Sequence, residues 1–71
     1  MERERVNSSN LESVGYEKSS MTLEIEFKNG GIYQYFNVSE DIFEALMNAN
    51  SHGSYFHANI RNGGFDYKKV G

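Results

Sequence analysis

The feature that most constrains the fold is a strict alternation of apolar and polar side chains that ends in a glycine turn. Residues 21–28 carry apolar side chains at every odd position. A period of two places those side chains on one face of a β-strand. Asn29-Gly30-Gly31 follows, and residues 32–36 resume an extended, aromatic-rich pattern. Because Asn-Gly between two extended runs is a strong hairpin signal, we predict a β-hairpin over residues 21–36.

The register of this hairpin has two solutions, which place its tyrosines on opposite faces. A two-residue turn pairs Phe27 with Ile32 and leaves Tyr33 and Tyr35 beside the glutamates of the polar face. A three-residue turn with a glycine bulge pairs Ile25 with Tyr33 and turns both rings inward. A shift of one residue exchanges the two faces of a strand, and the sequence leaves both registers open.

The flanking segments predict helices and further strands. Residues 11–18 indicate a short strand with a bulge at Gly15, and residues 65–70 a weak edge strand. Ser39 before two acidic residues is typical of a helix N-cap, and an apolar stripe follows it. We expect a second short helix capped by Ser54. The expected fold is α+β: a small antiparallel β-meander of three strands plus a short C-terminal edge strand, with two short helices packed on one face.

Length and composition limit the domain organisation and the compartment. The chain has 71 residues, a net charge of −3 and no cysteine. We expect one domain over residues 10–71, and a flexible, charged leader over residues 1–9. Without cysteine no disulfide or thiolate–metal site can form. No apolar run is long enough to span a membrane and the N-terminus lacks a signal peptide, so we expect a cytoplasmic protein.

An ordered set of short motifs runs along the chain. The motifs are Ser8-Ser9-Asn10-Leu11, Val14-Gly15-Tyr16, Leu23-Glu-Ile-Glu-Phe27 with Asn29-Gly30, Tyr33-Gln34-Tyr35, Ala49-x-Ser51-x-Gly53 with Tyr55-Phe56, and Ile60-Arg61. This set resembles the KTSC domain, a family named from the C-terminus of some lysyl-tRNA synthetases. The family usually has proline where this chain has Ser39, and serine suits a cap. The resemblance implies a small bacterial or phage protein without an established function, for which RNA binding has been suggested.

The charge is distributed unevenly, which makes RNA the first candidate partner. Residues 1–58 carry four basic and nine acidic side chains, whereas residues 59–71 carry three basic and one acidic. Phe65 and Tyr67 interleave with Arg61, Lys68 and Lys69, so these five residues are a candidate stacking-and-phosphate surface. On charge alone, lysines that protect an edge strand from aggregation are the simpler interpretation.

Tyr33 and Tyr35 define a second candidate, a protein-interaction or self-association surface on the hairpin. Exposed tyrosines are favoured interface anchors, whereas the neighbouring Glu24 and Glu26 would repel phosphate. If both rings turn inward they serve as core packing, which the small size of the domain favours.

Catalysis and metal binding find little support. His52 and His57 lie about 140° apart around a helix, and no carboxylate with metal-ligand spacing joins them. Ser51 and Ser54 are near histidine in sequence, but adjacency is not the geometry of a catalytic triad. We also expect too little room for a ligand pocket of several hundred Å³. The sequence therefore predicts a non-enzymatic binding module without metal, cofactor or membrane partner.

Overall fold

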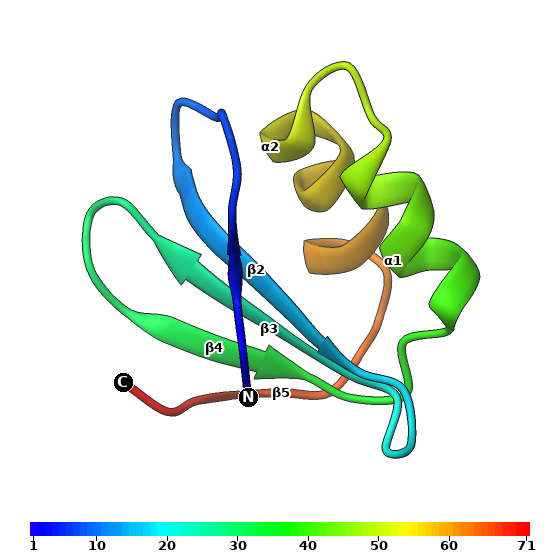
Figure 1. Cartoon of the computed structure of the whole chain (residues 1–71). Coiled ribbons are helices and arrows are strands. Elements are labelled where there is room, and N and C mark those ends of the chain that lie inside the picture. The colour runs from blue at the N-terminus through cyan, green and yellow to red at the C-terminus, as the bar shows by residue number, and fades with distance from the viewer.

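Five strands pair in chain order, so that the sheet reads β1-β2-β3-β4-β5 in the computed structural model of residues 1–71. The strands are β1 (Glu4–Arg5), β2 (Leu11–Glu17), β3 (Thr22–Phe27), β4 (Ile32–Tyr35) and β5 (Tyr67–Lys69), and every pair is antiparallel. The helices α1 (Glu40–Met47) and α2 (His52–Phe56) and the π-helical turn η1 (His57–Arg61) lie together on one face of the sheet (Figure 1). The predicted α+β class is confirmed.

The β3–β4 hairpin adopts the three-residue turn. The Phe27 N–H donates to the Gly31 carbonyl, and the Gly30 N–H donates to the Phe27 carbonyl, each at 3.0 Å. Both glycines have positive φ, +95° and +102°, which a side chain would disfavour. Ile25 consequently lies opposite Tyr33. Both hairpin tyrosines therefore share the inner, helix-covered face, and the hairpin glutamates lie on the outer face.

The predicted strand count of four is corrected to five, because the segment expected to be a flexible leader supplies β1. In this strand Glu4 pairs with Val14 of β2. The N-terminal residues before it continue across the outer face, where a Cβ on Gly15 would lie 2.6 Å from the Glu2 carbonyl oxygen. Figure 1 shows this dark-blue segment running across the sheet on the side away from the helices. The glycine in β2 thus allows a close chain crossing.

Serine side chains begin both helices. The Ser39 hydroxyl accepts a first-turn N–H of α1, which confirms the predicted cap. The second helix begins earlier than predicted, because the Ser51 hydroxyl accepts the Ser54 N–H and Ser54 lies inside α2. α2 runs directly into η1, where the Asn62 N–H donates to the His57 carbonyl at 3.3 Å in an i→i+5 bond. This wide turn carries the chain from the core towards the sheet edge.

The core lies between the helices and the inner face of the sheet. Its nine buried hydrophobic side chains are Leu11, Val14, Leu23, Ile25, Tyr35, Val38, Leu46, Phe56 and Ile60. Two of the motifs noted in the sequence meet beside it, because a Cβ on Gly53 would lie only 2.2 Å from the side-chain oxygen of Asn10. The start of β2 is therefore in direct contact with α2. No helix of the protein combines the length and apolarity needed to cross a membrane.

Candidate nucleic-acid interface

An open cleft of about 460 Å³ lies between the β3–β4 turn, strands β4 and β5, and η1. Its lining combines five aromatic rings with three polar side chains and one glycine: Phe27, Tyr33, Tyr35, Phe56, Tyr67, Asn29, Arg61, Asn62 and Gly30. The volume is comparable to that of small-molecule sites, but the space is an open groove. The space opens at the surface beside the core and not within it.

The aromatic rings of the cleft form one connected cluster. Ring centroids lie 5.4 Å apart for Tyr35 and Phe56 and 5.5 Å apart for Tyr35 and Tyr67. Phe27 joins the cluster through Phe56 at 5.5 Å and through Tyr33 at 5.6 Å. Such edge and tilted contacts hold aromatic rings in defined orientations. The buried members therefore support the members that face solvent.

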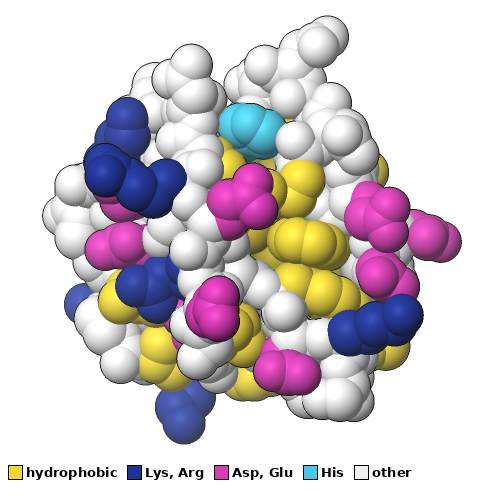
Figure 2. Space-filling view, viewed as in Figure 1, with side chains coloured by type: hydrophobic (Ala, Val, Ile, Leu, Met, Phe, Trp, Pro, Cys, Tyr) yellow, Lys and Arg dark blue, Asp and Glu magenta, His cyan; other side chains and the backbone are white.

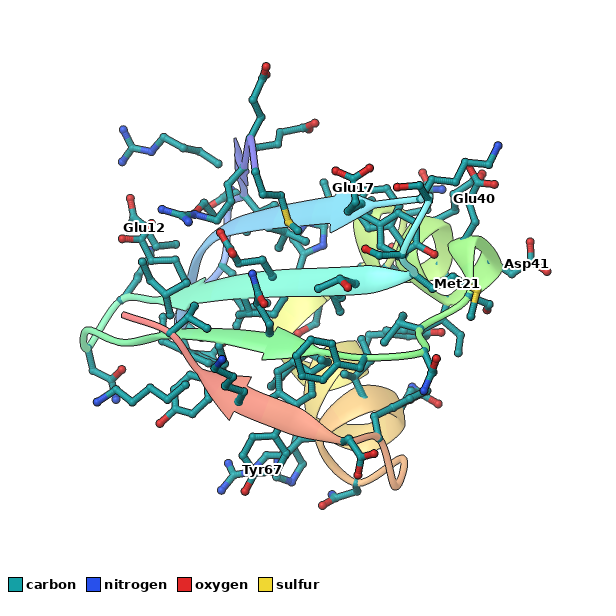
Figure 3. The ribbon with its side chains drawn as sticks, turned by 90° about the horizontal axis from the view of Figure 1, so that it is seen from below. Glu12, Glu17, Met21, Glu40, Asp41 and Tyr67 are labelled. Atoms are coloured by element: carbon teal, nitrogen blue, oxygen red, sulfur yellow. The ribbon has the colours of Figure 1, made fainter.

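Tyr67 is the exposed member of the aromatic cluster. Its exposed fraction is 62%, against 6% for Tyr35 and 2% for Phe56. Figure 3 shows Tyr67 at the edge of the sheet beside β5, away from the acidic side chains labelled in that view. A partly free ring face backed by packed rings is a platform on which a planar ligand can stack.

The electrostatics of the cleft are set by one arginine. Burial raises the pKa of the Tyr35 phenol, Arg61 opposes this, and the neighbouring Tyr67 and Tyr33 raise the pKa further. The Tyr35 phenol is therefore neutral near pH 7. Because no carboxylate lines the cleft, Arg61 supplies its charge.

Four of the seven basic side chains form no ion pair, and two of these four line the cleft or the hollow beside it. Three of the seven form ion pairs with carboxylates: Arg3, Arg5 and Lys18. The other four, which form none, are Lys28, Arg61, Lys68 and Lys69. An adjoining hollow of about 410 Å³ shares Arg61 with the cleft and also contains Lys28. Figure 2 shows most Lys and Arg side chains on the side of the β3–β4 turn, with several acidic side chains among them and further acidic side chains over α1.

The structure divides the five-residue surface predicted from the C-terminal sequence. Arg61 and Tyr67 line the cleft together. Lys69 lies opposite Tyr33, on the inner face of the sheet. Lys68 belongs to the outer face, since adjacent residues of a strand point to opposite sides.

Phe65 and the hairpin tyrosines also have defined places. Phe65 is half-buried and packs against the core and against Gly63, where a Cβ would lie 2.9 Å from its ring. Tyr33 and Tyr35 do not form the outward platform considered from the sequence. Instead they face the helices and line the cleft with Tyr67.

Sequence reasoning missed five residues of the cleft: Phe27, Phe56, Asn29, Asn62 and Gly30. Phe27 and Phe56 also join or contact the core. Asn29 and Asn62 each precede a glycine, as turn residues commonly do. The asparagine before each glycine was the available signal, because a turn places its polar side chains next to the neighbouring helix or strand.

The outer face of the sheet is a closed polar network around Arg3. Its Nε donates to the Ser13 hydroxyl at 2.9 Å, and its guanidinium pairs with Glu24 and lies 3.7 Å from Glu26. The second Glu24 oxygen accepts from Gln34 at 2.8 Å. Burial opposes ionisation of Glu24, but hydrogen bonds from Gln34 and Arg3 outweigh burial and lower the pKa of Glu24 below its ordinary value. Within this network Arg3, Glu24 and Glu26 are all paired.

The histidines take no part in either surface. The Nδ1 atom of His52 lies 2.8 Å from the Leu46 carbonyl oxygen, which links α2 to the end of α1. No group of three or more His, Asp or Glu side chains comes together in a way that could hold a metal ion.

The fold and the cleft define a class: a small α+β domain with a five-stranded meander, helices on one face and an aromatic, basic cleft at one end. The family model of the KTSC domain matches residues 7–65. The chain therefore belongs to the KTSC domain family. A crystal structure of a KTSC domain protein from Yersinia pestis has the same fold, with a TM-score of 0.93 and 38% sequence identity, covering 99% of this chain and 97% of that one.

Curated relatives are of two kinds. A lysine–tRNA ligase from Nostoc sp. is 42% identical over 60 residues, which is 84% of this chain and 10% of the ligase. An uncharacterized protein from Stutzerimonas stutzeri is 39% identical over 79% of both chains. This chain thus spans about a tenth of the length of the ligase and about four fifths of the smaller relative.

Proposed function

We propose that this protein binds single-stranded RNA in the aromatic cleft and catalyses no reaction on it. The observation that carries the proposal is the joint presence of Tyr67, 62% exposed, and Arg61 in one cleft. Recognition of single-stranded nucleic acid combines base stacking on aromatic rings with cationic contacts to phosphate. The two side chains supply one contact of each kind.

The placement of charge supports the same ligand. The net charge of −3 predicts poor binding of nucleic acid by the surface as a whole. Four acidic residues are paired with Arg or Lys: Glu12, Glu24, Glu26 and Glu40. Figure 3 shows Glu17, Glu40 and Asp41 at the end of the sheet opposite the β3–β4 turn, whereas Asp66 is unpaired and directly precedes Tyr67 in the chain. A strand of RNA that enters at the cleft meets Arg61 first and then Lys28 in the adjoining hollow.

The relatives favour RNA over a protein partner. Lysine–tRNA ligases act on tRNA by name, and the part of the Nostoc sp. enzyme that matches this chain is about a tenth of its length. A domain attached to an enzyme that handles tRNA is well placed to contact RNA. The alternative of a protein-interaction or self-associating module relied on outward-facing Tyr33 and Tyr35, and their rings face inward. We propose that the protein meets its RNA in the cytoplasm.

The test is a fluorescence anisotropy titration of labelled single-stranded RNA at about 50 mM and about 200 mM salt. We expect wild-type binding to weaken with salt, and Arg61→Ala to bind roughly tenfold less tightly with a salt slope smaller by about 0.7. Arg5→Ala is the matched control, because the side chain of Arg5 on β1 is 85% exposed but is paired with Glu12 of β2. Absence of binding at low salt, or equal losses in the two variants, would overturn the proposal.

A further inference from the structure

The hollow beside the cleft brings two unpaired cations together without a carboxylate. Its volume is about 410 Å³, and it is lined by Phe27 and five polar residues: Ser9, Asn10, Lys28, Asn29 and Arg61. Three separate parts of the chain supply them, namely the segment before β2, the β3–β4 turn and the last residue of η1. Neither Lys28 nor Arg61 forms an ion pair with the protein. The hollow is therefore suited to an anion.

The side chain of Asn10 is held so that its amide nitrogen is the free group. The Ser8 hydroxyl donates to the side-chain oxygen of Asn10 at 3.1 Å. The same oxygen lies against Gly53 of α2, where a Cβ would lie only 2.2 Å from it. The oxygen is thus occupied within the fold, whereas the nitrogen donates to no group of the protein. Asn10 therefore adds a hydrogen-bond donor to the two cations.

Backbone hydrogen bonds fix the spacing between Asn10 and Lys28. The Lys28 N–H donates to the Asn10 carbonyl at 2.9 Å, which joins the end of β3 to the start of β2. The Leu11 N–H donates to the Ser8 hydroxyl at 3.3 Å, so the turn before β2 is closed as well. Polar groups on an ordered backbone lose less entropy on binding than groups on a mobile loop.

The charge of the hollow matches a phosphomonoester better than a phosphodiester. A phosphomonoester carries a charge of about −1.5 to −2 near pH 7 and offers three strong acceptor oxygens. Each phosphodiester within a nucleic-acid strand carries a single negative charge. The two cations Lys28 and Arg61 balance the charge of the monoester, and the Asn10 amide can donate to one of its oxygens.

We propose that the hollow binds the terminal phosphate of an RNA strand, while the nucleotide that carries this phosphate occupies the aromatic cleft. Arg61 lines both spaces, so it can contact the phosphate of a nucleotide whose base stacks on Tyr67. This inference rests on the proposed RNA binding and adds recognition of the strand end to it. It assigns no base, because stacking on an aromatic ring tolerates every base.

The experiment compares three single-stranded RNAs with equal numbers of phosphate groups. They are a hexamer with a 5′-phosphate, a hexamer with a 3′-phosphate, and a heptamer with a hydroxyl at both ends. We expect the wild type to bind one of the two hexamers roughly tenfold more tightly than the heptamer. Lys28→Ala should reduce this ratio to within about twofold, because the hollow loses one of its cations. Lys68→Ala, which removes an unpaired lysine from the outer face, is the matched control and should keep the ratio.

A second variant reverses the polarity of the hollow at Asn10. Asn10→Asp keeps an oxygen that accepts from Ser8 and replaces the free amide nitrogen with a carboxylate oxygen. We expect the preference for the phosphorylated hexamer to fall roughly tenfold, whatever the change in absolute affinity. Asn50→Asp adds the same charge outside the hollow and should keep the preference.

The outcomes separate the terminal-phosphate site from RNA binding itself. Equal binding of the heptamer and both hexamers by the wild type, with Arg61→Ala still weakened, would overturn the phosphate site and leave RNA binding standing. A preference that survives either Lys28→Ala or Asn10→Asp would also overturn the site. No binding of any of the three RNAs would overturn both proposals.

Discussion

The two faces of the sheet use the same residue type for different purposes. Arg3, on the outer face, contacts Ser13 and two carboxylates of β3, and its side chain is only 26% exposed. Arg61, beside the inner face, contacts no carboxylate and lines a cleft of aromatic rings. An arginine whose partners lie within the chain stabilises the fold, whereas one without such partners is available to a ligand.

The burial of Glu24 explains why this carboxylate on the outer face needs hydrogen-bond donors. Glu24 is 6% exposed, and a buried carboxylate without hydrogen bonds would destabilise the folded state by several kcal/mol. Arg3 and Gln34 remove this cost by donating to both carboxylate oxygens. At the cleft, water can solvate Arg61 in the free protein. The following variants test the contrast between the two faces, beginning with the largest expected effect.

Removal of the Glu24 carboxylate on the outer face should destabilise the protein without changing its affinity for RNA. We expect Glu24→Ala to lower the free energy of unfolding by about 2 kcal/mol, because Arg3 and Gln34 lose their shared partner. Urea denaturation measures this change. The control is Glu12→Ala, whose partner Arg5 is exposed, and which should cost less than about 0.5 kcal/mol. Equal losses in the two variants would contradict a special role for the outer network.

Removal of Arg61 and removal of Arg3 should affect different properties of the protein, RNA binding in the first case and stability in the second. Arg61→Ala should weaken RNA binding roughly tenfold, about 1.4 kcal/mol, and change the free energy of unfolding by less than about 0.5 kcal/mol. Arg3→Ala should lower the free energy of unfolding and leave RNA binding unchanged. Both quantities are measured on both variants by anisotropy and urea denaturation. If Arg3→Ala weakens binding as much as Arg61→Ala at equal stability, the two faces are not separate in function.

Acid should weaken the outer network gradually. The pKa of Glu24 is lower in the folded protein, so the unfolded chain binds more protons between the two pKa values. The stabilisation is complete above the unfolded pKa of about 4 and is lost as pH falls through the folded pKa. We expect the wild type to lose stability more steeply than Glu24→Gln between about pH 5 and about pH 3, measured by urea denaturation. Parallel pH profiles would argue against the network.

The smallest expected effect on RNA binding comes from the adjacent residues Lys68 and Lys69. Lys69 shares the inner face with Tyr33, whereas Lys68 lies on the outer face with Gln34. Lys69→Ala should weaken RNA binding about twofold and reduce the salt slope by up to about 0.7, whereas Lys68→Ala should change neither measurably. Anisotropy titrations at several salt concentrations measure both. A larger effect from Lys68→Ala would place part of the RNA on the outer face.

Local patterns were sufficient for much of the fold. The alternation of residues 21–28, the glycine turn after it and the serine cap of α1 all depend on neighbours within a few positions, and all three predictions are confirmed. The family was also recognisable, because its motifs are short and ordered along the chain. The cap of α2 was placed three residues late, since Ser51 and Ser54 are equally suitable in isolation.

Strand β1 and the members of the cleft could not be predicted locally. Two charged residues show no strand pattern of their own, and β1 exists because it pairs with β2 and because Arg3 reaches a glutamate 21 positions away. The cleft takes residues from the β3–β4 turn, from strands β3, β4 and β5, from α2 and from the end of η1. Their proximity depends on how these elements pack.

The sequence alone thus determined the α+β class, the hairpin, the first helix and the family, because periodicity and capping are properties of consecutive residues. Tertiary structure decided that Tyr33 and Tyr35 face inward, that Lys68 is separated from Arg61, and that aromatic rings and Arg61 share one cleft. The physical reason is that a one-residue change in register reverses which side chains share a face. In this hairpin the register follows from the three-residue turn, which the sequence alone did not distinguish from a two-residue turn.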